Sequence, residues 1–266
     1  MKRISLFLAV VALTTMVAFG QKRETRQVSS FTGINASSVF DITVSKGSTE
    51  SLVIEADDAV MPLVRSEVRN GVLHLYLDNA RNVKNIKTLK ASVVMRNLEQ
   101  VSLSGASKLT AKDLYTPDNF KGDCSGVAKL AVKVNTGKLS IEASGASKVE
   151  MQANVTGDVK INASGTSKIE LDLKAIQVKL NSSGVGKIDL KGSATDIKIE
   201  ASGTSKLDAE NFAVKTATVE SSGTSKITLH VDDTLQVNSS GTSSVEYKGS
   251  PVIDAKVGGV SKVRKM

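Results

Sequence analysis

The sequence contains no tryptophan, one cysteine, two histidines, three tyrosines and three prolines among its 266 residues. A single cysteine cannot form a disulfide within the chain, so no disulfide framework holds the fold together. The two histidines, His74 and His230, lie in unrelated strand-like segments. The chain therefore has little histidine, the side chain that most often transfers protons in enzymes. These absences count against catalysis and favour a structural or binding protein.

The chain opens with an apolar run that two basic residues precede. Lys2 and Arg3 precede Ile4–Phe19, and Ala18-Phe19-Gly20 places small residues at positions −3 and −1 of a cleavage site before Gln21. Residues 1–20 are therefore predicted to be a signal peptide, and we expect export. The run is short for a membrane anchor, so no transmembrane segment is expected after cleavage. Removing Lys2 and Arg3 lowers the formal net charge from +8 to +6, which is evenly spread and predicts no nucleic-acid binding.

A short motif, Ser-Gly-x-Ser-Lys, recurs from residue 104 to the end of the chain. The complete copies are Ser104–Lys108, Ser144–Lys148, Ser164–Lys168, Ser202–Lys206 and Ser222–Lys226, and degenerate copies begin at Ser125, Ser183, Ser240 and Gly258. Their glycines are 18 to 21 residues apart. Such a period is typical of a solenoid, in which each copy is one coil that buries its apolar face only against its neighbours.

The residues around each glycine alternate between apolar and polar. Counted from the glycine, positions −4, −2 and +4 are apolar or small, +3 is usually lysine, and +5 is often an acid. Around Gly165 these positions hold Ile161, Ala163, Ile169, Lys168 and Glu170. A period of two with β-branched residues on the apolar phase predicts strands with one buried face. A coil of ~19 residues suits two or three short strands, with the Ser-Gly step at a corner. We predict an all-β fold, a right-handed parallel β-helix (β-solenoid).

The repeat also divides the chain. After the signal peptide, residues 21–27 are predicted to be a short linker. Residues 28–98 lack the motif but remain strand-like, with a hairpin or corner signal at Arg69-Asn70-Gly71. We predict that they form irregular opening coils and a cap, because a solenoid needs a protected end. Residues 99–266 are predicted to form the regular solenoid.

The opening segment carries a family resemblance. Its strand-like stretches and turns, together with the later Ser-Gly-x-Ser-Lys copies, resemble the head GIN domain family; the matching stretches are Phe31-Thr32-Gly33-Ile34-Asn35, Phe40–Gly47, Val53–Asp58 and Asn70-Gly71-Val72-Leu73. The resemblance covers nearly all of the chain after residue 27. It implies an adhesin of the Gram-negative envelope, in the periplasm, on the outer surface or outside the cell, and it implies no catalytic residues.

The lysine at position +3 gives the candidate interaction face. Equal phases of successive coils lie about 4.8 Å apart in a parallel ladder, so a bare lysine column would repel itself by about 0.9 kcal/mol per pair. The acids at +5 offset that repulsion. Two interpretations remain open: a solubilising surface, or a stripe that binds a ligand. The residues of the candidate face are Lys148, Lys168, Lys187, Lys206 and Lys226.

No catalytic residue, cofactor or metal site is predicted. The glycine repeats do not match the calcium-binding nonapeptide, and the acids recur as columns rather than as clusters. Cys124 stands where other coils have Ala or Ser, so we interpret it as a small core residue. We predict a non-enzymatic adhesion or interaction module with an envelope, surface or glycan ligand. The alternatives are a polysaccharide-active β-helix enzyme and a periplasmic scaffold without an external ligand.

Overall fold

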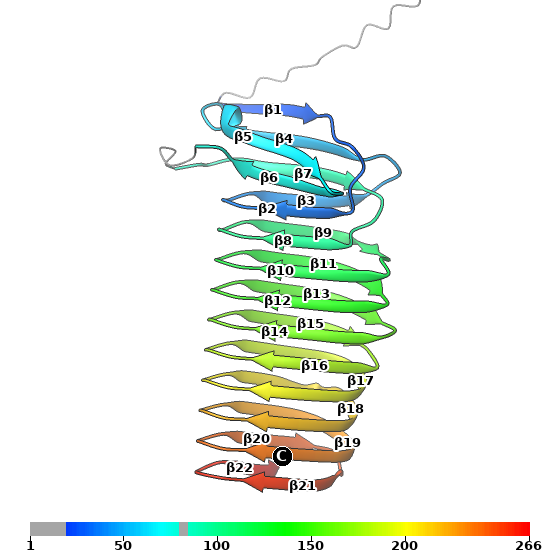
Figure 1. Ribbon diagram of the computed structural model, residues 1–266, viewed down its shortest axis with the longest axis vertical. Helices are drawn as coiled ribbons and strands as arrows, with labels where there is room; N and C mark the ends of the chain where they lie inside the picture. Colours follow the sequence, from blue (N-terminus) through cyan, green and yellow to red (C-terminus); the bar gives the residue numbers. More distant parts are fainter. Residues whose placement is uncertain (1–19, 80–84) are drawn as a thin grey trace, which may run out of the picture.

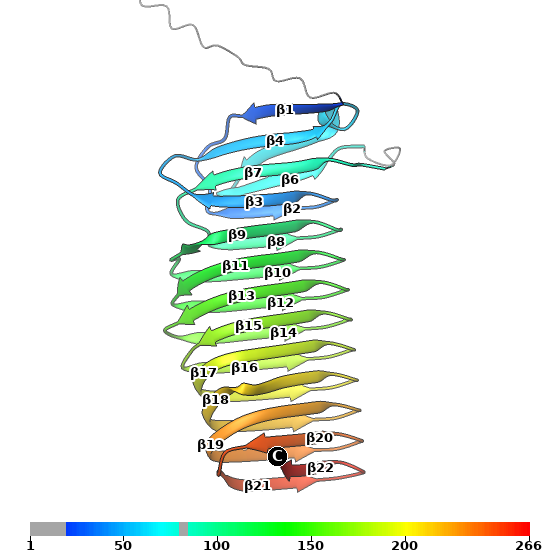
Figure 2. The same ribbon diagram turned by 180° about the vertical axis from the view of Figure 1, so that it is seen from behind.

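The computed structural model describes residues 20–79 and 85–266, so the predicted signal peptide lies almost wholly outside the described residues. The chain is a β-solenoid of about nine turns with a spacing of ~19 residues (Figure 1). The predicted β-solenoid is confirmed. Each regular coil is flattened and contributes one strand to each of two layers, as the front and back views show (Figures 1 and 2).

One layer, which we call the upstream sheet, contains the strands that lead into the Ser-Gly corner. Its strands in spatial order are β5 (Val64–Arg69), β6 (Val72–Leu77), β2 (Gly33–Ala36), β8 (Gln100–Leu103), β10 (Asn119–Cys124), β12 (Lys138–Ala143), β14 (Asp158–Ala163), β16 (Gln177–Ser182), the second parts of β17 (Lys187–Ala201), β18 (Lys206–Ser221) and β19 (Lys226–Ser239), and β21 (Val252–Val257).

The other layer, the downstream sheet, contains the strands that leave the corner. Its strands in spatial order are β1 (Gln21–Arg26), β4 (Ser51–Asp57), β7 (Leu89–Met95), β3 (Asp41–Lys46), β9 (Lys108–Tyr115), β11 (Lys129–Thr136), β13 (Lys148–Val155), β15 (Lys168–Lys174), the first parts of β17, β18 and β19, β20 (Ser244–Lys248) and β22 (Lys262–Lys265). From β17 to β19 each strand runs on from one sheet into the other.

The core is the thin space between the two sheets. Ile161, Ile169, Ile199 and Ile227 are completely buried, as the period-two pattern predicts. The side chain of Lys168, one residue from Ile169, is 40% exposed. Because the side-chain period of a strand is two, this single pair of neighbours fixes the register of the whole coil. The predicted inward and outward phases are confirmed.

The Ser-Gly step is a corner, and the corners line up along one edge of the stack (Figure 1). Gly165 has a φ of +67°, a conformation that residues with a side chain rarely adopt. The next residue, Thr166, donates its backbone N–H to the carbonyl oxygen of Gly145 in the preceding coil at 2.7 Å. Val185 repeats this bond to Gly165 at 2.8 Å. The hydrogen-bond ladder therefore continues around the corner without a break.

The amino-terminal end is capped, and one prediction there is wrong. Residues 21–27, predicted to be a linker, contain β1, which pairs antiparallel with β4. This strand is mostly exposed, so it has no buried face and therefore no apolar alternation from which it could be predicted. The predicted hairpin at Asn70-Gly71 is confirmed between β5 and β6. A short 3-10 helix, η1 (Met61–Leu63), precedes β5.

The first regular coil comes from β2 and β3, which the sequence motif did not reveal. Ser38 occupies the position of the repeat glycine, with a φ of +72°, and its carbonyl oxygen accepts the N–H of Ala106 at 2.7 Å. The chain then leaves this coil to build the cap and returns to stack β8 and β9 beneath it. The repeat motif did not reveal this coil because its corner consists of Ser37-Ser38 and contains no glycine.

Candidate functional site

The five candidate lysines form a continuous column on the downstream sheet. Their pairing is in register from one strand to the next, and the column extends upward through Lys129 to Lys108; its members in order are Lys148, Lys168, Lys187, Lys206 and Lys226. Lys187, Lys206 and Lys226 are exposed, and Lys148 and Lys168 are half-buried on the same outward face. The structure therefore brings all five candidate residues together on one face.

Most of these ammonium groups are already paired with the acids at position +5. Lys148 contacts Glu150 and lies 3.3 Å from Glu170, while Lys168 lies 2.6 Å from Glu170. The two ammonium groups hold the pKa of Glu170 below its usual value. Lys187 and Lys226 have similar partners at 3.0 and 3.2 Å. The acids neutralise most of the charge of the column, which favours a stabilising and solubilising role over a ligand-binding one.

The upstream sheet carries a second pair of columns, at positions −5 and −3, which the sequence analysis did not identify. Ion pairs join them at Lys121–Asp123 (3.0 Å), Lys179–Glu200 (3.4 Å), Lys198–Glu200 (3.0 Å) and Lys198–Glu220 (3.1 Å). The signal was present in the sequence, because lysine recurs at −5 in four coils as part of the same alternation. These ion pairs fill the space between the columns and leave a groove on either side.

The first groove lies between positions −7 and −5 and follows the solenoid axis. Its upper part has a volume of about 570 Å³ and begins at the hairpin turn of Asn70-Gly71. A lower part of about 360 Å³ continues from Asp158 towards Thr218. Because the strands of successive coils lie in register, the groove continues from one coil to the next and has no closed end within these coils.

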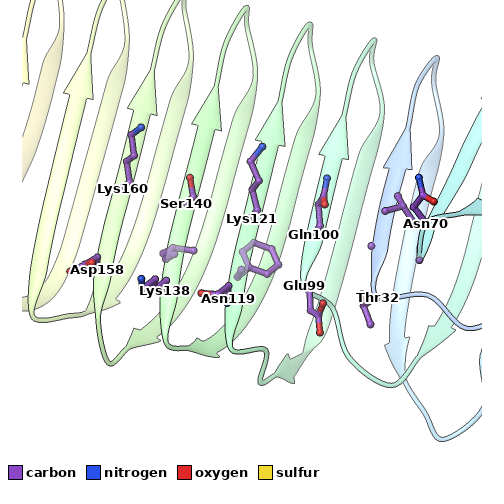
Figure 3. A pocket seen from close by; sticks show the side chains of 15 residues that line it. Thr32, Asn70, Glu99, Gln100, Asn119, Lys121, Lys138, Ser140, Asp158 and Lys160 are labelled. Carbon is purple, nitrogen blue, oxygen red and sulfur yellow. The ribbon is translucent and has the colours of Figure 1, made fainter.

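The walls of the upper groove consist of two rows of side chains (Figure 3). One row, which we call the amine row, comprises Gln100, Lys121, Ser140 and Lys160, which pair in register from β8 to β14 and point the same way. The other, the strand-start row, comprises Glu99, Asn119, Lys138 and Asp158. The floor includes Phe120 and Leu139, both of which are buried in the core. Amides, a hydroxyl, amines and carboxylates thus line one open channel.

The second groove lies on the other side of the ion pairs, between positions −3 and −1. Two parts, of about 320 and 620 Å³, share Asn162 and Ser164. Asn181 donates its side-chain N–H to Oδ1 of Asn162 at 2.9 Å, while its own Oδ1 is buried without a hydrogen-bond partner. The next residue in the column is Glu200, another acceptor, so the amide ladder ends there.

The structure places the reactive residue types far from one another. Cys124 is buried, and burial raises the pKa of its thiol to about 12. His74 lies on β6 of the cap, and His230 lies on β19 near the other end. Among residues 20–79 and 85–266, no group of three or more His, Cys, Asp and Glu side chains could hold a metal ion. In the same ranges no helix is long and apolar enough to cross a membrane.

Several solved structures share this fold, three of which illustrate the likeness. A putative adhesin from Parabacteroides merdae is 20% identical and has a TM-score of 0.73, with coverage of 93% of this chain and 96% of the other. A protein named as a putative lipid binding protein, from Parabacteroides distasonis, is 15% identical with a TM-score of 0.68, with 93% and 97% coverage. A putative adhesin from Bacteroides fragilis is 20% identical with a TM-score of 0.52, with 94% and 98% coverage. At these identities the likeness shows the fold alone.

No curated protein matches the chain. The family model described as "Putative auto-transporter adhesin, head GIN domain" matches residues 30–157 and 152–251, which together span most of the solenoid and its cap. The match includes both the irregular opening coils and the repeated corners, in agreement with the resemblance seen in the sequence. The chain belongs to the head GIN domain family.

Proposed function

We propose that the protein is an exported, non-enzymatic adhesion or interaction module that binds an envelope, surface or glycan ligand along the outside of its solenoid. The observation that supports this proposal is the open groove beside the amine row, because it presents polar side chains in register in successive coils at a spacing of about 4.8 Å. A polymer lying along the axis could contact several coils at once, and such repeated weak contacts add to give useful avidity.

The composition of the grooves favours a polar ligand. Amide, hydroxyl, amine and carboxylate groups line the walls, and these groups form hydrogen bonds with hydroxyl and charged groups rather than with acyl chains. The rigid stacked backbone holds them in fixed positions, so binding requires little ordering of the protein. The family's description as an adhesin supports the same general role.

A binding screen with the mature chain, residues 21–266, tests this proposal. The protein is immobilised and exposed to neutral glycans, acidic glycans and solubilised envelope proteins, and fractionation of the native cells establishes its location. We expect saturable binding of at least one class by an exported protein. Release of new reducing ends or unsaturated products from a polysaccharide would support the enzyme alternative instead. An exported protein that binds none of the probes would support the scaffold alternative.

A further inference from the structure

We propose that the upper groove of the upstream sheet binds an acidic polysaccharide whose carboxylates are separated by hydroxyl or amide groups. This inference rests on the proposed function and names the ligand class of that site. The amine row and the strand-start row define the place (Figure 3). Two lysines in these rows differ in their charge pairing from Lys179 and Lys198 further along the sheet.

Two lysines of the upper groove have no carboxylate partner. Among the described residues, no carboxylate oxygen lies within 4.0 Å of the ammonium group of Lys138 or of Lys160. Lys121, Lys179 and Lys198, at the same −5 phase as Lys160, are all paired at 3.0 to 3.4 Å. The two unpaired cations therefore lie in adjacent strands of one groove and are available to an anion.

The sequence explains why Lys160 has no partner. Each paired lysine has an acid either two positions later in its own strand or at the matching position of the next coil, whereas Lys160 has Asn162 and Asn181 at these two places. The amide oxygen of Asn162 accepts a hydrogen bond from Asn181 at 2.9 Å. The acid column is thus interrupted by two amides, Asn162 and Asn181, between Glu142 and Glu200. The two amides beside Lys160 leave it without the close ion pair that the other lysines of its row form.

The other groups in the groove limit the charge density of the ligand. Glu99 and Asp158 lie in the strand-start row, so a dense polyanion such as nucleic acid or a heavily sulfated glycan would meet repulsion along the same wall. Gln100, Asn119 and Ser140 provide donors and acceptors for hydroxyl and amide groups. A chain with well-separated carboxylates satisfies both requirements.

The direction of the groove fits an extended chain. Lys121 and Lys160 lie two coils apart, about 9.6 Å at about 4.8 Å per coil, with Ser140 between them in the same row. A polymer along the axis would therefore meet the ammonium group of Lys121, which is paired with Asp123, then the hydroxyl of Ser140 and the unpaired ammonium group of Lys160. A chain in which uncharged sugars separate the acidic ones can place a carboxylate at Lys160 and a hydroxyl group at Ser140.

Hyaluronan oligosaccharides are a suitable probe, because each disaccharide carries one carboxylate beside hydroxyl and amide groups. Their binding to residues 21–266 is measured at low and moderate salt, with the carboxyl-reduced oligosaccharide and heparin as comparison probes. The test variant is Lys138→Gln/Lys160→Gln. The matched control is Lys129→Gln/Lys206→Gln, which removes the same charge from the downstream sheet, where neither lysine has a carboxylate within 4.0 Å among the described residues. Thermal melts establish that all variants are folded.

We expect weak, salt-sensitive binding of hyaluronan and little binding of the carboxyl-reduced form. The groove variant should lose roughly fivefold or more in affinity, since each exposed charge pair contributes up to about 1 kcal/mol, while the control should change less than about twofold. Equal losses in both variants, or stronger binding of heparin that is independent of Lys138 and Lys160, would overturn the proposal. If only a neutral glycan or an envelope protein binds, the ligand class is wrong but the proposed function stands.

Discussion

The carbonyl oxygen of Gly145 lies 2.7 Å from the position that a Cβ atom on Gly165 would occupy. The backbones of successive corners are therefore in contact at the tip of each coil, and there is no room for a side chain between them. The same approach recurs between Gly223 and Gly241, at 2.6 Å. The glycine of the repeat is thus required by the close stacking of backbone on backbone, in addition to its positive φ.

Gly165→Val should lower the free energy of unfolding by several kcal/mol, because the substitution combines an unfavourable φ with a clash against a hydrogen-bonded backbone. Gly259→Val has the same clash, with the oxygen of Gly241 at 2.6 Å, but lies in the last described coil. We expect a much smaller loss there, since a terminal coil can fray without separating the others. Urea unfolding of both variants measures the difference, and equal losses would contradict it.

Gly186→Ser is the matched control for the corner glycines. Gly186 occupies the +2 position, where the other coils usually have serine, and its nearest neighbour to a new Cβ is the oxygen of Ser167 at 3.5 Å. The substitution meets only ordinary van der Waals contacts, so the free energy of unfolding should change by less than about 1 kcal/mol. A large loss would show that any side chain in this corner is harmful, irrespective of the contact with the preceding backbone.

The serines at +2 are not equivalent. Ser107 donates its hydroxyl to the carbonyl oxygen of Ser104 at 2.9 Å, whereas the hydroxyl of Ser167 is buried without a partner. Ser107→Ala should therefore cost about 1 kcal/mol, and Ser167→Ala should leave stability unchanged or raise it by up to about 1 kcal/mol. Thermal and urea unfolding of the two variants provide the comparison. A clear loss in Ser167→Ala would indicate a hydrogen bond that the structure does not show.

The lysine column of the downstream sheet should tolerate single changes but not reversal. Lys168→Ser removes one exposed pair with Glu170, so stability should change by less than about 1 kcal/mol. Replacing Lys148, Lys168, Lys187 and Lys206 together by Glu places two carboxylate columns side by side. The melting temperature should then fall strongly at low salt and recover at high salt, because salt screens the repulsion. A melt that is insensitive to salt would contradict the role of the column.

Glu246 should make the last described coils sensitive to acid. Its carboxylate contacts Arg264 and lies 3.2 Å from Lys226, and these contacts hold its pKa below the usual value. A lowered folded-state pKa means that the stabilisation is present above the unfolded pKa of about 4.3 and is lost as the pH falls through the folded pKa. Glu246→Gln should therefore be less stable than wild type at pH 7, and the difference should shrink below pH 4. A constant difference across this range would contradict the assignment.

The regular part of the fold could be predicted from the sequence because one strand phase repeats. Ile161, Ile169 and Lys168 show their inward or outward direction through a period of two, and the glycine interval sets the length of the coil. The cap could be predicted only in part. β1 is held by backbone pairing to β4 and buries no apolar face, so it has no hydrophobic signature. Ser38 replaces a glycine by adopting the same positive φ, which composition does not reveal.

The candidate site could be predicted less well than the fold. The five lysines of the downstream sheet point outward and are in register, but the structure shows that carboxylates neutralise most of them. The unpaired cations Lys138 and Lys160 were missed because pairing depends on which side chains meet across neighbouring coils. Predicting which side chains pair requires the exact register of the upstream sheet, and the coils of this sheet are spaced unevenly, at 18 to 21 residues.

We propose above all that the protein binds its ligand on the outer face of its upstream sheet. Amide chemical-shift mapping of isotope-labelled residues 21–266 during a titration with hyaluronan oligosaccharides tests this claim most directly. We predict shifts that concentrate at Gln100, Lys121, Ser140 and Lys160, with the lysine column of the downstream sheet unchanged. Shifts confined to the downstream sheet, or spread evenly over both faces, would contradict the account.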